Sequence, residues 1–153
     1  MSKIAFVFPG QGSQYVGMCK AFYDQYPVAR QLFEEADDAL GFSLTKLCFE
    51  GPEAELRLTY NTQPAILTAS TICAEILKQH GAVADIAAGH SLGEYSALVN
   101  AGAMKFADAV RIVRQRGQFM QEAVPVGEGS MSAVMGLAND KIVELCQKVE
   151  TET

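Results

Sequence analysis

The sequence predicts an α/β protein with a parallel sheet, organised around one serine at a sharp bend between a strand and a helix. After Lys3, residues 4–8 are apolar without alternation, as in a parallel strand that is buried on both faces. Residues 85–90 are mostly small and apolar, and the amphipathic stretch 92–99 follows them. Between the two lies Ser91, with glycines two positions before and two positions after it. This order of strand, serine and helix is the layout of a nucleophile elbow.

The physical demands of such an elbow explain the residue types around Ser91. The bend strains the backbone of the serine and exposes its hydroxyl above the end of the sheet. Strand and helix then pass so closely that side chains at positions 89 and 93 would clash, and both positions are glycine. The helix that starts at Leu92 would direct free N–H groups at an oxyanion. The alternative interpretation is an ordinary tight turn, because a G-x-S-x-G pattern also occurs by chance.

Composition argues against several classes of function. The chain has 153 residues, 49% hydrophobic and 20% charged, as in a globular protein of one domain. A net charge of −6 without a basic block argues against a nucleic-acid partner. The apolar run 4–8 is too short for a signal peptide or a membrane span, so we expect a cytoplasmic protein with no membrane partner. We expect the four cysteines to be reduced and buried, without a metal, because none forms a C-x-x-C pair.

The first half of the chain is expected to be mainly helical after the opening strand. The loop 9–14 breaks the strand with one proline and two glycines, and it is either an ordinary connection or a backbone that approaches a ligand. Apolar residues at helical spacing from Val28 to Leu40 predict a helix that Gly41 closes. Two short helices are expected at residues 44–49 and 53–58.

The clearest helix is predicted to begin at a turn, residues 61–64, and to end at Gly81. Its expected buried stripe consists of Ile66, Ala69, Cys73, Ile76, Leu77 and His80. A hinge at residues 125–129, a strand at 130–137 and a last helix capped by Asn139 are expected near the end of the chain.

A further helix, predicted from Phe106 to about Ala123, carries three arginines, and these are interpreted in two ways. Surface arginines often serve solubility alone. However, Arg116 is followed by Gly117, and a glycine there weakens the helix and opens space around the guanidinium. That pair favours a site in which the arginine fork holds a carboxylate.

Taken together, several blocks of the sequence resemble one family: the malonyl-CoA:acyl carrier protein transacylases and the related acyltransferase domains of polyketide synthases. The resemblance extends along the whole chain in the family's order. The blocks that carry it are Phe8–Gln14, Thr62–Ile66, Gly89–Tyr95, Arg116–Gly117 with Phe119–Gln121, and Gly129–Leu137.

The resemblance implies an acyl transfer through a covalent malonyl-serine at Ser91. Backbone N–H groups of Gln11 and Leu92 would form the oxyanion hole, and Arg116 would bind the malonyl carboxylate. Gln63 would support the pocket, and His90 would shape the elbow. No permanent cofactor and no metal are implied. Malonyl-CoA would be the substrate.

The resemblance also implies a carrier protein as acceptor and a chain organised in two parts. The acyl group would pass to the phosphopantetheine thiol of acyl carrier protein, an acidic partner for which Lys105, Arg111 and Arg114 are candidate contacts. Residues 1–124 would be the first part of an α/β-hydrolase-like core. Residues 125–153 would be the first strand and helix of a small ferredoxin-like subdomain. A monomer is expected.

The sequence departs from the family at the general base that a serine nucleophile needs. His90 is adjacent to Ser91 on a strand, so the two side chains should point to opposite faces. His80 is expected at the end of a helix. The resemblance places the catalytic histidine beyond Thr153, so we expect an incomplete enzyme, free-standing rather than excised because the chain starts at Met1. The alternatives are a patatin-like or α/β-hydrolase esterase, a polyketide synthase acyltransferase domain, and a non-catalytic fragment.

Overall fold

The computed structural model describes residues 3–125, 127–128 and 134–150, and it divides into two compact units, Met1–Ala123 and Val124–Thr153. The strands of the first unit are β1 (Ala5–Phe8) and β2 (Ile86–Gly89). Its helices are α1 (Lys20–Gln25), α2 (Pro27–Leu40), α3 (Leu44–Glu50), α4 (Glu53–Leu56), α5 (Thr59–Gln79), α6 (Gly93–Asn100) and α7 (Phe106–Ala123). The second unit contains α8 (Asn139–Val149).

The sheet of the first unit is parallel, as predicted. β1 pairs with β2 in a register that places Ala5 opposite Ile86 and Phe8 opposite Gly89. The predicted burial of the first strand is wrong, since Val7 is 77% exposed and only Phe8 is buried. The reason is that β1 has one neighbouring strand among the described residues, and its aromatic side chains pack on one face only.

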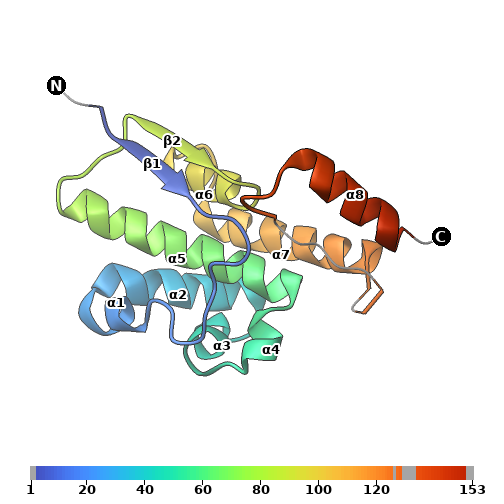
Figure 1. Ribbon diagram of the computed structural model, residues 1–153. Coiled ribbons are helices and arrows are strands. Elements are labelled where there is room, and N and C mark those ends of the chain that lie inside the picture. Colours follow the sequence, from blue (N-terminus) through green and yellow to red (C-terminus); the bar gives the residue numbers. More distant parts are fainter. Residues whose placement is uncertain (1–2, 126, 129–133, 151–153) are drawn as a thin grey trace. The chain divides into compact units, whose positions relative to one another are not determined.

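Helix α5 is the centre of the first unit. It packs against α2, α6 and α7, and Figure 1 shows it running between the two strands and α2. The core around it contains large, fully buried side chains from several helices: Phe33, Leu44, Leu56, Leu67, Ile72, Val110 and Val113. The helix over residues 106–123, which supplies Val110 and Val113, has the bounds predicted from its periodicity.

The beginning of α5 differs from the prediction, because residues 61–64 lie inside the helix rather than in a turn before it. Pro64 has no N–H, so the carbonyl of Tyr60 lacks its helical donor. Arg114, on α7, donates from Nη1 to that carbonyl oxygen at 3.0 Å and also to Oδ1 of Asn61. Its guanidinium stacks on the rings of Tyr60 and Phe42, at 4.6 and 4.8 Å from their centroids. A residue distant in the sequence thus allows the helix to contain a proline.

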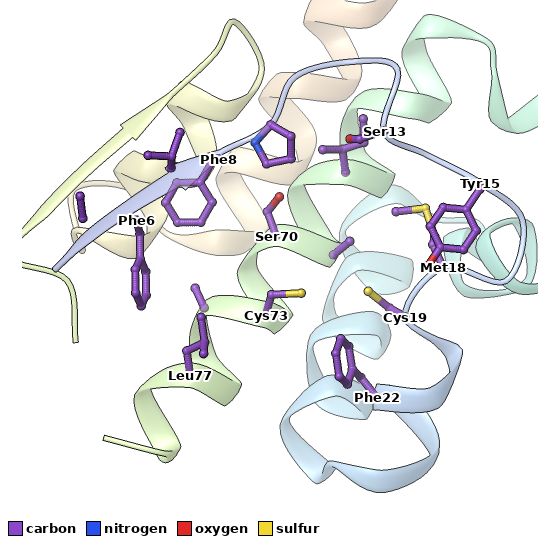
Figure 2. Close-up of a pocket in the computed structure, with 16 residues that line it drawn as sticks. Phe6, Phe8, Ser13, Tyr15, Met18, Cys19, Phe22, Ser70, Cys73 and Leu77 are labelled. Atoms are coloured by element: carbon purple, nitrogen blue, oxygen red, sulfur yellow. The ribbon is translucent and has the colours of Figure 1, made fainter. Parts of the chain in front are cut away.

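The predicted buried stripe of α5 is correct for Ile66 and Ile76 and wrong for Cys73, Leu77 and His80, which are exposed. Cys73 and Leu77 lie on the second half of the helix, and His80 is the C-cap residue that follows it. Cys73 and Leu77 line an open cavity of about 480 Å³ between β1, α1 and α5 (Figure 2).

The cysteines also differ in burial from what the sequence predicts. Cys48 is buried, Cys19 is half-buried, and Cys73 and Cys146 are exposed. All four have free thiols. The expectation of burial is therefore correct for Cys48 alone, because the segments around the exposed pair face a cavity or solvent rather than the core.

The second unit contains the predicted helix, and the described part of the predicted strand forms no strand. α8 begins at Asn139, with Ala138 in the N-cap position, so Asn139 is the first helical residue rather than the cap. Of the strand expected over residues 130–137, positions 130–133 lie outside the described residues and positions 134–137 form no strand. In neither unit does a described helix combine the length and the apolar character needed to cross a membrane.

Candidate active site

Ser91 lies between β2 and α6 with a backbone conformation that serine rarely adopts. Its φ is 52°, in the left-handed region, and its side chain is exposed. The glycines on both sides are required by close backbone approach. A Cβ on Gly89 would overlap the backbone of Gly93, and a Cβ on Gly93 would overlap the carbonyl of Phe8. A side chain at either glycine would push α6 away from the two strands. Ser91 lies where β2 ends and α6 begins, so this separation would displace it.

Arg116 connects Ser91 with Gln63 through the two ends of its guanidinium. Nη2 donates to Ser91 Oγ at 3.0 Å, and Nη1 donates to Gln63 Oε1 at 2.8 Å. Gln63 is fully buried, and its own amide nitrogen donates to Met120 Sδ at 3.2 Å. The ring of Tyr95 lies 5.8 Å from the guanidinium. The structure therefore brings three predicted site residues into one hydrogen-bonded group: Gln63 from α5, Ser91 from the turn before α6, and Arg116 from α7.

Gly117 has a different role from the one its sequence position indicates. It is buried, and a Cβ there would lie 2.5 Å from the Cα of Tyr60. The glycine therefore permits the close contact between α7 and α5, and does not open space around the guanidinium. This contact sets the distance between Arg116 on one helix and Gln63 on the other.

The loop after β1 lies against the segment that carries Ser91. A Cβ on Gly10 would lie 2.8 Å from Nδ1 and 2.9 Å from the carbonyl oxygen of His90. The side chain of Gln11 donates to Thr59 Oγ1 at 3.3 Å, at the start of α5. Among the hydrogen bonds of the described residues, none has the backbone N–H of Gln11 or Leu92 as its donor. Gln11 is exposed and Leu92 is buried.

Neither histidine of the chain hydrogen-bonds Ser91 in the described structure. His90 N–H donates to the carbonyl of Phe8 at 3.1 Å, while its ring lies against Gly10. His80 caps the C-terminal end of α5 and its ring contacts Tyr26 at 6.2 Å between centroids. The described partner of the Ser91 hydroxyl is Arg116.

This arrangement places an exposed hydroxyl beside a cation that a buried amide orients. A guanidinium held in this way can turn from the hydroxyl to a carboxylate, its preferred partner. Sequence reasoning missed the roles of Tyr95, Thr59 and Met120. Of the three, Tyr95 had a signal in the sequence, since it is the last residue of the Gly89–Tyr95 block that carries Ser91.

Of the basic residues considered for a carrier protein, Arg114 is half-buried and makes its hydrogen bonds within the fold. Burial lowers its pKa, and both its hydrogen bonds go to the first turn of α5. Lys105 and Arg111 are exposed, and Arg111 pairs with Asp108 at 3.3 Å.

Comparison with known proteins places the chain among acyl transferases. A family model described as "Acyl transferase domain" matches residues 5–150. The chain is 56% identical over 152 residues to a malonyl CoA-acyl carrier protein transacylase of Bacillus subtilis strain 168, covering 99% of this chain and 48% of that protein. It is 52% identical over 149 residues to the protein of that name in Escherichia coli K12, covering 97% of this chain and 48% of the relative.

Solved structures agree with these relatives. An acyl-carrier-protein S-malonyltransferase from Burkholderia pseudomallei matches with a TM-score of 0.85 and 53% identity, over 96% of this chain and 48% of the other. A malonyl-transacylase in complex with a type II polyketide acyl carrier protein matches with a TM-score of 0.88 and 48% identity, over 97% and 48%. The chain spans about half the length of the curated relatives it matches.

Proposed function

Because this chain belongs to the acyl transferase domain family, we propose that it supplies the nucleophile and the acyl-binding arginine of a malonyl-CoA:acyl carrier protein transacylase. The observation that carries the proposal is the group formed by Ser91, Arg116 and Gln63. It joins an exposed hydroxyl on a strained backbone to an oriented cation. The strand, serine and helix at residues 86–100 are proposed to act as a nucleophile elbow. In that role, the backbone strain at Ser91 keeps its hydroxyl exposed.

In the proposed first step, Ser91 Oγ attacks the thioester carbonyl carbon of malonyl-CoA. The carbonyl oxygen becomes an oxyanion that accepts hydrogen bonds from the N–H groups of Gln11 and Leu92. The C–S bond then breaks, coenzyme A leaves as the thiol after taking up the serine proton, and malonyl remains esterified to Ser91. In other enzymes, removal of one hydrogen-bond donor from an oxyanion hole lowers the rate about 100- to 1000-fold.

In the proposed second step, the phosphopantetheine thiol of acyl carrier protein attacks the malonyl ester, and the serine hydroxyl is restored. In both steps, Arg116 would bind the malonyl carboxylate after releasing Ser91 Oγ, while Gln63 keeps the guanidinium in place. The general base is not assigned to either described histidine, because neither contacts Ser91. We assign the general base to a residue in the part of the relatives' sequences that this chain does not cover. No resident cofactor has a role in either step.

The alternative of a simple serine esterase is disfavoured by Arg116. An esterase for uncharged acyl groups has no use for a cation hydrogen-bonded to its nucleophile and held by a buried glutamine. Residues 125–153 are proposed to begin the small ferredoxin-like subdomain, which α8 supports by its amphipathic pattern.

The test is a transfer assay with labelled malonyl-CoA and acyl carrier protein that bears its phosphopantetheine. The unmatched half of the Bacillus subtilis relative is added as a separate polypeptide. We expect label on the carrier protein, and we expect its loss in Ser91→Ala. Free malonate without labelled carrier would indicate a hydrolase, and label on neither would contradict acyl transfer.

A further inference from the structure

Two cysteines that have no part in the proposed acyl transfer meet at the wall of the cavity between β1, α1 and α5. Cys19 is the residue that precedes α1, and Cys73 lies in the second half of α5. Both line the cavity of about 480 Å³. Figure 2 shows their sulfur atoms pointing toward one another from the two helices. The two thiols thus come together through the fold, since they are distant in the sequence.

The surroundings of this pair favour reaction at Cys73. Its side chain is exposed to the cavity, so a small oxidant can reach it. The hydrogen bond from the Cys19 thiol lowers the pKa of Cys73 to about 7, against the opposing effect of burial. The same contact raises the pKa of Cys19. The Cys19 contact thus favours the thiolate of Cys73, which is the form that reacts with peroxides.

The rest of the cavity wall contains few other groups that titrate or that could pair with the Cys73 thiolate. Among the residues that line it, the remaining titratable group is Tyr15, and none is acidic, basic or a histidine. Cys48 is close enough to influence Cys19 but is fully buried, and burial raises its pKa to about 12. It is thus protected from oxidation by the same core that encloses it.

We propose that Cys19 and Cys73 form a redox-active pair that closes to an intramolecular disulfide when a hydroperoxide enters the cavity. The Cys73 thiolate attacks the hydroxyl oxygen of the hydroperoxide, the O–O bond breaks, and Cys73 becomes a sulfenic acid. The other oxygen leaves as hydroxide or alkoxide and takes a proton from solvent to become water or an alcohol. The Cys19 sulfur then attacks the Cys73 sulfur. The hydroxyl of the sulfenic acid departs with the Cys19 proton as a molecule of water. Overall, two thiols are oxidised by two electrons and one peroxide is reduced.

The bond would change the loop that connects β1 to α1. Cys19 ends this loop, has a left-handed φ of 61°, and would become fixed on α5. The loop carries Gln11, which already contacts the start of α5 through Thr59. Oxidation would therefore attach the loop to α5 at both of its ends. This inference does not rest on the proposed acyl transfer.

The test uses the chain with hydrogen peroxide as the probe. After oxidation, the chain is denatured, its remaining thiols are labelled with N-ethylmaleimide, and trypsin separates the cysteines onto peptides 4–20, 47–57, 58–78 and 142–148. We expect a cross-linked species of peptides 4–20 and 58–78 that is two hydrogens lighter than their sum. Label should be lost from these two peptides and retained on the other two, and dithiothreitol should reverse the loss.

Matched variants make the result specific. Cys19→Ser and Cys73→Ser should each abolish the cross-link, whereas Cys146→Ser, at another exposed cysteine, should leave it unchanged. Circular dichroism checks that each variant is folded. A dominant cross-link to Cys48 or Cys146, oxidation of Cys73 to sulfinic acid without a cross-link, or full retention of label on peptides 4–20 and 58–78 would overturn the proposal.

Discussion

Substitution of Arg116 by alanine should impair the reaction with malonyl-CoA and spare the reaction with acetyl-CoA. In the structure, Nη1 of Arg116 stays on Gln63 while Nη2 contacts Ser91 Oγ, so Nη2 is the group that can turn to a carboxylate. A hydrogen bond between charged groups contributes about 1.5–3 kcal/mol. Since about 1.4 kcal/mol corresponds to a factor of ten, the malonyl acylation rate should fall about 10- to 150-fold.

The acetyl group has no carboxylate, so its acylation rate should change little. The assay measures acylation of Ser91 by each thioester in single-turnover reactions. The chain is mixed for this purpose with the unmatched half of the Bacillus subtilis relative, as in the transfer assay above, and this mixture is called the complemented protein. Arg111→Ala is the matched control, because Arg111 lies on the same helix, is exposed and pairs with Asp108. Gln63→Leu should lower the malonyl rate by a smaller factor, because the cation is kept and only its orientation is lost. Equal losses for malonyl and acetyl in Arg116→Ala would refute the carboxylate site.

Four further outcomes are expected. Gly117→Ala should destabilise the fold by about 1–3 kcal/mol in urea denaturation, because its Cβ would meet Tyr60, while Gln118→Ala on the same helix should have little effect. Arg114→Met should lower the free energy of unfolding by about 1.5–3 kcal/mol. The loss should be smaller in a Pro64→Ala background, because the backbone N–H at position 64 then donates to the Tyr60 carbonyl; equal losses in both backgrounds would contradict this compensation. Ser91→Gly should abolish acylation yet stabilise the chain by about 0.5–1 kcal/mol, because glycine accepts the left-handed φ without strain; unchanged or lower stability would count against strain at this position. Alkylation of Cys73 by iodoacetamide should accelerate as the pH rises through about 7, because the thiolate forms there, while Cys48, with a pKa raised to about 12 by burial, should react negligibly; matching pH profiles would contradict this difference.

Local sequence patterns were sufficient for most helices and for the parallel pairing. The apolar periodicity of residues 106–123 gave the bounds of α7, and Gly41 closes α2 with a left-handed φ of 72°. The residue types around Ser91 predicted strain, and its φ of 52° lies in the strained region. These features depend on neighbours within one or two turns, which a single sequence displays.

The failures concern contacts between residues that are distant in the sequence. Pro64 is read locally as a helix start, whereas it lies inside α5, and Arg114 on another helix donates to the carbonyl oxygen of Tyr60 that the proline leaves without a helical donor. Gly117 is read as space for Arg116, whereas its true neighbour is the backbone of Tyr60. The spacing of Cys73 fits a buried stripe, but the cavity beside β1 leaves it exposed. In each case the deciding partner comes from another element of the fold.

The identity of the nucleophile is best examined by mass. The complemented protein is incubated with malonyl-CoA, its intact mass is recorded, and the tryptic peptide 79–105 is fragmented to distinguish Ser91 from the buried Ser96. We predict one added malonyl group, located on Ser91 and absent in Ser91→Ala. A malonyl adduct on any other residue, or one that persists in Ser91→Ala, would contradict the assignment of Ser91.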